Sequence, residues 1–160
     1  MNKAYILTGG NTGNRELHLA KAMAEIDTRC GQVRKQSSLY ETAAWGKTAQ
    51  TSFLNQAMLI HTKLAPETLL QCLLDIERSM GRIRNEKYGA RSIDIDILIY
   101  NQQIVESATL SIPHSELTNR LFALLPLFEI APRLKHPVFN KTIGQLLTLC
   151  PDKLPVRKIG

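Results

Sequence analysis

Cysteine is scarce in this sequence, and its few occurrences form no recognisable motif. The 160 residues contain three cysteines, Cys30, Cys72 and Cys150, which are odd in number, far apart and free of any Cys-x-x-Cys spacing. A disulfide framework uses an even set of cysteines, and structural zinc sites use closely spaced pairs. The pattern therefore argues against both, and we expect three reduced, buried thiols.

Long apolar runs are also missing. The apolar stretch near the N-terminus is too short for a signal peptide, and no later stretch is long enough to span a bilayer. We therefore expect a cytoplasmic protein with no membrane partner. Internal repeats, low-complexity runs and linkers rich in Gly or Ser are absent from the sequence, so residues 1–160 are expected to form a single domain.

The overall composition is that of an ordinary globular chain. Hydrophobic residues make up 44% and charged residues 21% of the sequence, and 160 residues are enough to bury a core. The net charge of +6 implies an anionic partner, which could be nucleic acid, a membrane surface or a small polyphosphate. Charge alone does not separate these partners, so the location of the charged residues has to decide.

The periodicity of the first hundred residues predicts alternating strands and helices. Strand patterns cover 4–8, 33–40, 53–62 and 93–100, and helical periods run from Leu17 to a stop at Gly31 and from Pro66 to a stop at Gly81. This βαββαβ order, with helices on one face, predicts an α+β fold of the ferredoxin-like sandwich type.

The last third of the chain is interrupted by proline. Short helical patterns are predicted at 115–120, 124–131 and 142–149. We expect this region to add C-terminal short helices and strands that pack over the same sheet.

Two aspartates stand out in the strand predicted at 93–100. Because side chains alternate along a strand, Asp94 and Asp96 share one face, while the isoleucines at 93, 95, 97 and 99 share the other. Adjacent side chains on one face lie about 6–7 Å apart. Two carboxylates this close repel each other, so a cation is the natural counterpart. The pair is a candidate Mg²⁺ site, although an isolated Asp-x-Asp is somewhat more often just the polar side of a half-exposed strand.

A basic segment precedes the acidic strand, with Arg82, Arg84, Lys87 and Arg91 within about ten residues. Such a segment alone is usually solvated surface. Its position beside the aspartates favours a polyphosphate ligand, because Mg²⁺ and guanidinium groups can bind different phosphate oxygens. The glycines of 9–13 lack a Walker A or dinucleotide-binding pattern and are read as a flexible turn. His114 is a candidate phosphate ligand or proton donor.

The segment 87–98 closely resembles the signature of the 6-hydroxymethyl-7,8-dihydropterin pyrophosphokinase family, which acts in folate biosynthesis. Further matching segments occur along the chain in the family's order: Gly9-Gly10-Asn11, Tyr40-Glu41-Thr42, Phe53-Leu54-Asn55, 81–84, Pro113-His114, 119–122 and 126–132. The resemblance implies a monomeric, ferredoxin-like enzyme. Its substrates would be ATP, bound with two Mg²⁺ ions, and the pterin, and it would transfer pyrophosphate to the pterin hydroxymethyl group and release AMP.

The resemblance also implies the residues of the ATP half of the site. Asp94 and Asp96 would be the metal ligands. The side chains that would act in catalysis are Arg82, Arg91, Asp94 and Asp96. The residues that would bind ATP are Glu77, Arg82, Arg84, Arg91, Ile97, Ser111, His114 and Arg120.

The pterin half of the site is implied in the same way. Phe53 and Phe122 would sandwich the ring, and Asn55 and Thr42 would hydrogen-bond its edge, since an amide offers a donor and an acceptor in one plane. The full set that would contact the pterin is Thr42, Ala43, Trp45, Phe53, Asn55, Tyr88, Asp94 and Phe122.

Two other functions are weighed against this one. An RNA-binding ferredoxin-like module would suit a basic protein, but its sheet should carry stacking aromatics, whereas Asp94 and Asp96 would repel a nucleic-acid backbone. We therefore expect no nucleic-acid partner. A glycosyltransferase can also use Asp-x-Asp for a metal-bound nucleotide sugar, but this chain is short for one; release of AMP rather than a nucleoside diphosphate distinguishes the two.

Overall fold

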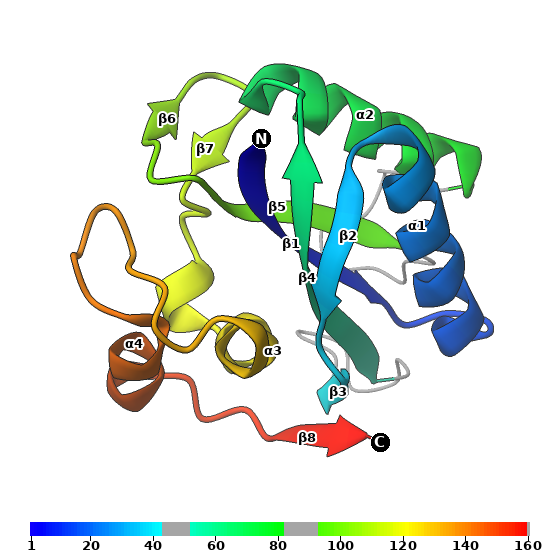
Figure 1. The fold of residues 1–160 in the computed structure, drawn as a ribbon. Helices are drawn as coiled ribbons and strands as arrows, with labels where there is room; N and C mark the ends of the chain where they lie inside the picture. Colours follow the sequence, from blue (N-terminus) through cyan, green and yellow to red (C-terminus); the bar gives the residue numbers. More distant parts are fainter. Residues whose placement is uncertain (43–51, 82–92, 160) are drawn as a thin grey trace.

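The computed structural model describes residues 1–42, 52–81 and 93–159. A six-stranded antiparallel sheet forms its centre, with helices on both faces (Figure 1). No helix in the described ranges is long and apolar enough to cross a membrane.

The sheet has the strand order β5-β1-β4-β3-β8, and β2 also pairs with β4. The strands are β1 (Asn2–Gly10), β2 (Gln32–Gln36), β3 (Leu39–Thr42), β4 (Phe53–Thr62), β5 (Asp94–Tyr100) and β8 (Val156–Ile159). The order β5-β1-β4-β3 is that of a ferredoxin-like sandwich, which confirms the predicted fold class. The strand predicted at 33–40 is divided into β2 and β3. The pairing of β2 with β4 shifts register and ends, and the chain pairs with β4 again only in β3.

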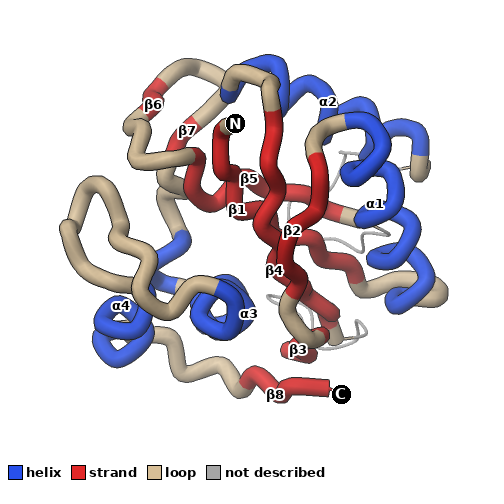
Figure 2. The backbone as a smooth tube through the Cα atoms, viewed as in Figure 1, coloured by secondary structure: helices blue, strands red, loops and turns tan. Residues whose placement is uncertain are grey.

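Two helices cover one face of the sheet, α1 (Arg15–Arg29) and α2 (Pro66–Ser79), as Figure 2 shows. Asn14 caps α1 by accepting a hydrogen bond from the Leu17 amide, and Pro66 starts α2 at a position where its missing N–H costs nothing. Their apolar stripes bury Leu19 and Leu73 in a cluster with Ile95 and Ile97 of β5. This is the first core.

The other face is covered by the C-terminal helices, α3 (Leu121–Ile130) and α4 (Ile143–Leu149), which follow the 3-10 turn η1 (Leu117–Asn119). They bury Leu124 and Ile143 against Leu7 and Leu59 of the sheet, which forms a second core. The expectation that the last third packs over the sheet is therefore confirmed. The two helices of the predicted βαββαβ order lie on one face, and the C-terminal helices cover the other, because β1, β4 and β5 carry apolar side chains on both sides.

Short strands complete the C-terminal part of the fold. The strands β6 (Val105–Glu106) and β7 (Ser111–Ile112) form a separate hairpin. The last strand, β8, extends the sheet beyond β3.

A β-bulge interrupts the predicted alternation of β5. Tyr5 pairs with Ile99 and Ile6 pairs with Ile97, so Leu98 is an extra residue opposite β1. Leu98 and Ile99 consequently both pack in the second core, whereas Ile95 and Ile97 pack in the first. The predicted orientation of Ile99 is therefore wrong, while Asp94 and Asp96 precede the bulge and share a face as predicted.

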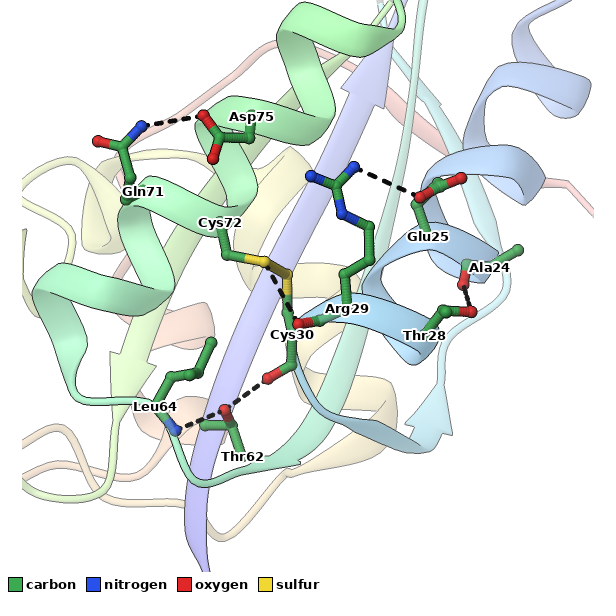
Figure 3. Close-up of a disulfide and its surroundings, with 10 residues drawn as sticks. All are labelled: Ala24, Glu25, Thr28, Arg29, Cys30, Thr62, Leu64, Gln71, Cys72 and Asp75. Atoms are coloured by element: carbon green, nitrogen blue, oxygen red, sulfur yellow. Dashed lines mark hydrogen bonds and ion pairs between the residues drawn. A yellow bond between two sulfur atoms is a disulfide. The ribbon is translucent and has the colours of Figure 1, made fainter.

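The expectation of three reduced thiols is also wrong. Cys30 at the end of α1 and Cys72 in α2 form a disulfide with a Cα–Cα distance of 6.2 Å, and only Cys150 is a free thiol (Figure 3). The two cysteines are 42 residues apart and meet because α1 and α2 lie side by side on the same face. Cys150 packs against the second core, on the other side of the sheet.

Candidate active site

The candidate site lies on the α3 face of the sheet, beyond the edge of the second core. A single cross-strand row there contains Asp94 of β5, Gly9 of β1, Asn55 of β4 and Tyr40 of β3. Neighbouring strands are about 4.8 Å apart, so Asp94 and Asn55 are about 10 Å apart at the backbone, with Gly9 between them. Because Gly9 has no side chain, the Asn55 amide can lie against the backbone of β1 at this position.

Asp94 and Asp96 both lie half-buried on this face, alternating with the buried Ile95 and Ile97. Asp96 is opposite Leu7, two residues along the strands from the pair of Asp94 and Gly9. Two carboxylates that project together suit Mg²⁺, which takes one or two protein carboxylates together with phosphate oxygens of a substrate. Within the described ranges, no group of three or more His, Cys, Asp or Glu side chains could hold a metal ion.

Asn55 is fixed above Gly9. Its side chain is 7% exposed, and its Nδ2 donates to the carbonyl of Thr8 at 3.3 Å. A Cβ added at Gly9 would overlap Asn55 Nδ2 and would lie 3.3 Å from the Leu54 carbonyl oxygen. The sheet therefore accepts only glycine at this position without displacing the amide. This close approach is the structural reason for a glycine that the sequence indicated only as part of a turn.

Phe53, the first residue of β4, and Thr42, the last residue of β3, are a cross-strand pair. Phe53 is half-buried and lies on the same face as Asn55, which is two residues later in the strand. The Thr42 hydroxyl donates to the carbonyl of Pro155 at 3.0 Å. The hydroxyl thus already donates its hydrogen bond within the protein. Toward a ligand, the hydroxyl oxygen can act only as an acceptor.

The first turn of α3 brings Arg120 and Phe122 to the same face. Phe122 is half-buried against the second core, and the Arg120 guanidinium carbon lies 5.5 Å from the centroid of its ring. Arg120, the residue before α3, makes no side-chain cap, and the amide of Leu121 donates instead to Asp152 Oδ2 at 3.0 Å. The residue that anchors this turn therefore comes from the C-terminal segment.

His114 is held beside the bulge of β5. Its amide donates to the Leu98 carbonyl at 2.9 Å, and its ring Nδ1 accepts from the Glu116 amide at 3.1 Å. The pKa of His114 is lowered from 6.5, chiefly by burial and further by the Arg120 guanidinium, while the carboxylates of Asp94 and Glu116 oppose the shift. The neutral ring then carries its proton on Nε2, where it can donate to an anion.

Of three predicted nucleotide contacts, two lie on the other face of the sheet and one bonds within the protein. Glu77 of α2 is 1% exposed and accepts from the Ile95 amide at 2.7 Å, and Ile97 is buried in the first core, so both side chains lie on the opposite face from Asp94. Ser111 of β7 donates to Glu106 at 2.6 Å. The side chains of Glu77 and Ile97 therefore lie on the other side of the sheet from the aspartates. The predicted residues that lie outside the described ranges are Ala43, Trp45, Arg82, Arg84, Tyr88 and Arg91.

Sequence reasoning missed an ion cluster next to the site. Glu41 of β3 accepts from Arg15 at 2.8 Å and from Arg157 of β8 at 2.7 Å, and Ser52 donates to it as well. Hydrogen bonds from Arg157, then Arg15 and Ser52, lower the pKa of Glu41 from 4.5 to about 2. Glu41 stood within the matching segment Tyr40-Glu41-Thr42, but nothing in the sequence indicated a partner 116 residues away.

Comparison with known proteins gives consistent matches along most of the chain. The sequence model of the 7,8-dihydro-6-hydroxymethylpterin-pyrophosphokinase (HPPK) family matches residues 5–132. Two similar relatives are the 2-amino-4-hydroxy-6-hydroxymethyldihydropteridine pyrophosphokinases of Aquifex aeolicus, 36% identical over 91% of this chain and 90% of the relative, and of Bacillus subtilis, 41% identical over 90% and 87%.

Solved structures match the fold. The wild-type HPPK-DHPS of Plasmodium falciparum with STZ-DHP superposes with a TM-score of 0.74 at 20% identity, over 92% of this chain and 43% of that chain. The A437G form with SDX-DHP gives a TM-score of 0.75 at 21% identity, over 92% and 45%. This chain thus spans less than half the length of these solved proteins, and the likeness concerns the fold of that part.

Proposed function

The chain belongs to the 7,8-dihydro-6-hydroxymethylpterin-pyrophosphokinase family, and we propose that the α3 face of its sheet is where it carries out the family's reaction. The enzyme is a 2-amino-4-hydroxy-6-hydroxymethyldihydropteridine pyrophosphokinase of folate biosynthesis, with ATP as co-substrate. The row Asp94–Gly9–Asn55 carries the proposal, because it sets a carboxylate and an amide on one face of the sheet, with the amide packed over Gly9.

The pterin half of the site is assigned to the Asn55 side of this row. A pterin is flat and has donors and acceptors along one edge, which an amide matches in one plane. Phe53 and Phe122 come from different elements, β4 and the first turn of α3, and both are half-buried on this face. They can stack on the ring from opposite sides. Thr42 would contribute an acceptor or its backbone, since its hydroxyl proton is bonded to Pro155.

The phosphate half is assigned to the Asp94 side. Asp94 and Asp96 would hold Mg²⁺, which would draw charge from the phosphate oxygens and favour the transfer. The neutral ring of His114 would donate from Nε2 to a phosphate oxygen, and Arg120 would supply positive charge nearby. Arg82, Arg84 and Arg91 are proposed as further phosphate ligands from the sequence resemblance, as are Glu77, Ile97 and Ser111 for the nucleotide.

The reaction needs alignment more than a strong base. The hydroxymethyl oxygen of the pterin attacks the β-phosphorus of ATP, the bond from that phosphorus to the oxygen bridging it to the α-phosphorus breaks, and AMP leaves. The hydroxyl proton is released to solvent. Arg82 and Arg91 are proposed to stabilise the charge that develops on the transferred group. Ala43, Trp45 and Tyr88 are proposed as additional pterin contacts.

Three wider expectations stay predictions. We propose a monomer, and a single domain over residues 1–160. The cytoplasm is the expected compartment, because ATP is abundant there. The Cys30–Cys72 disulfide weighs against it, since structural disulfides persist mainly in oxidising compartments.

The decisive experiment supplies the purified protein with Mg-ATP and 6-hydroxymethyl-7,8-dihydropterin and measures nucleotides and pterin diphosphate by chromatography. AMP and pterin diphosphate are expected in equal amounts, and neither should form without the pterin or with excess EDTA. Formation of ADP, or AMP release independent of the pterin, would contradict the proposal.

A further inference from the structure

The C-terminal segment, residues 152–158, touches both walls of the candidate pterin site and lies outside the part matched by the family model. In Figure 1 the chain leaves α4, passes below α3 and ends as β8 alongside β3. It thus connects, by contacts, the start of α3, which carries Phe122, with β3, which carries Thr42.

At the helix end, the contact is made by Asp152. Its Oδ2 accepts from the Leu121 amide at 3.0 Å, and its Oδ1 accepts from the Leu154 amide at 2.9 Å. Both carboxylate oxygens are therefore engaged, one with α3 and one with the segment itself. A negative charge at this end also complements the helix dipole. The bond fixes the residue immediately before Phe122.

At the strand end, β8 pairs with β3 in register, with Val156 opposite Thr42 and Arg157 opposite Glu41. The Pro155 carbonyl accepts a hydrogen bond from the Thr42 hydroxyl at 3.0 Å, and the Arg157 guanidinium donates a hydrogen bond to the Glu41 carboxylate at 2.7 Å. These contacts fix β3 at the position where Thr42 pairs with Phe53.

We propose that the C-terminal segment is a positioning element for pterin binding, which sets the spacing between Phe122 on α3 and Phe53 beside Thr42. The inference rests on the proposed function of this face. A purely structural role, covering the exposed edge of β3 and capping α3, predicts general destabilisation. A positioning role predicts a loss of pterin affinity that exceeds the loss of ATP affinity. Asp94 and Asp96 of the phosphate half lie on β5, which β1, β4 and β3 separate from β8, although Arg120 of that half directly precedes Leu121.

The test compares Asp152→Ala with Thr142→Ala. Thr142 caps α4 by accepting from the Gln145 amide at 3.1 Å, so its loss removes a comparable cap from a helix that carries no proposed site residue. A cap of this kind is worth about a fivefold change in equilibrium. We expect Asp152→Ala to raise the KM for the pterin about fivefold with the KM for ATP changed less than about twofold. Thr142→Ala should lower the melting temperature similarly and leave both KM values unchanged.

Arg157→Ala tests the strand end and should raise the KM for the pterin in the same selective way. An equal change in both KM values, or no change in a folded Asp152→Ala protein, would overturn the inference. If Asp152→Ala does not fold, Asp152→Asn, which keeps one carbonyl acceptor, is judged by the same criteria.

Failure of the proposed function is recognised separately, in the wild-type protein. If the wild type forms no pterin-dependent AMP, calorimetry with 6-hydroxymethyl-7,8-dihydropterin and α,β-methylene-ATP decides the inference. Weaker pterin binding by Asp152→Ala with unchanged nucleotide binding then supports it. Absence of pterin binding to the wild type, or equal binding by both proteins, overturns it.

Discussion

Asn55 lies directly over Gly9, with its side-chain amide bonded to the carbonyl of Thr8 at 3.3 Å. The contact joins a buried side chain of β4 to a glycine of β1, and it holds the amide close to the backbone of the sheet. An added methyl group would have to displace the amide or separate the strands.

Gly9→Ala is therefore expected to raise the KM for the pterin about tenfold, because it breaks a buried hydrogen bond and moves the proposed ligand. Overpacking should also cost about 1–3 kcal/mol of stability. Steady-state kinetics and urea unfolding measure the two effects. The double variant Gly9→Ala/Asn55→Ala should regain stability but not affinity. Gly144→Ala is the control, since its Cβ would meet the Phe128 ring at 3.3 Å and the Pro132 carbonyl oxygen at 3.6 Å, neither of which is an overlap. An unchanged KM in Gly9→Ala would refute the proposed role of Asn55.

Replacing either aspartate should remove most of the activity. Asp94→Asn and Asp96→Asn keep the shape of the side chains but lose the charges that would hold Mg²⁺, and we expect turnover to fall about a hundredfold or more. A Mg²⁺ titration of initial rates measures this loss and any shift in the metal requirement. Asp75→Asn is the matched control, because Asp75 is a half-exposed residue that pairs with Arg78 on α2. Near-normal rates for Asp96→Asn at limiting Mg²⁺ would exclude it as a ligand.

Local pattern was enough to predict the elements that carry the central part of this site. Strand β4 has the predicted bounds, Phe53–Thr62, because it pairs on both sides and its alternation of side chains is uninterrupted. Asp94 and Asp96 share a face for the same reason. The prediction for the orientation of Ile99 was wrong because the bulge depends on how β5 pairs with β1. The sequence of β5 alone does not determine that pairing.

Contacts between distant segments could not be predicted from the sequence. The Cys30–Cys72 disulfide requires α1 and α2 to be adjacent, and the bonds of Glu41 and Thr42 to the C-terminal segment require β8 to pair with β3. Each depends on the assembled sheet rather than on spacing along the chain. The face of Ile97, in contrast, followed from alternation, and places its side chain away from the aspartates.

Reduction of the Cys30–Cys72 disulfide should destabilise the protein. Closing a loop of 42 residues limits the unfolded chain, which corresponds to about 4 kcal/mol in the chain-entropy description. Urea unfolding with and without dithiothreitol measures this difference, and Cys150→Ser should leave it intact. Alkylation of the unreduced, denatured protein should modify one cysteine, Cys150. Modification of all three cysteines, or no effect of dithiothreitol, would argue that the thiols are reduced.

The Glu41 cluster predicts a specific dependence of stability on acid. The pKa of Glu41 is about 2 in the folded protein and its ordinary value is 4.5. The charged form is thus favoured by folding, so its contribution is fully present above pH 4.5 and is lost as the pH falls toward 2. Because Arg157 is 77% exposed and solvent screens it, we expect a contribution of about 1 kcal/mol.

Glu41→Gln keeps the shape of the side chain and removes this contribution, so its unfolding free energy should depend less on pH between 4.5 and 2 than that of the wild type. Urea unfolding at a series of pH values measures both curves. Some dependence will persist in the variant, because the pKa of Glu129 is also lowered: burial opposes that shift, but hydrogen bonds from Tyr40 and Ser38 outweigh it. Glu25→Gln is the control, since Glu25 pairs with Arg29 only at 3.5 Å on the surface of α1. Parallel curves for Glu41→Gln and the wild type would show that the cluster does not couple protonation to folding.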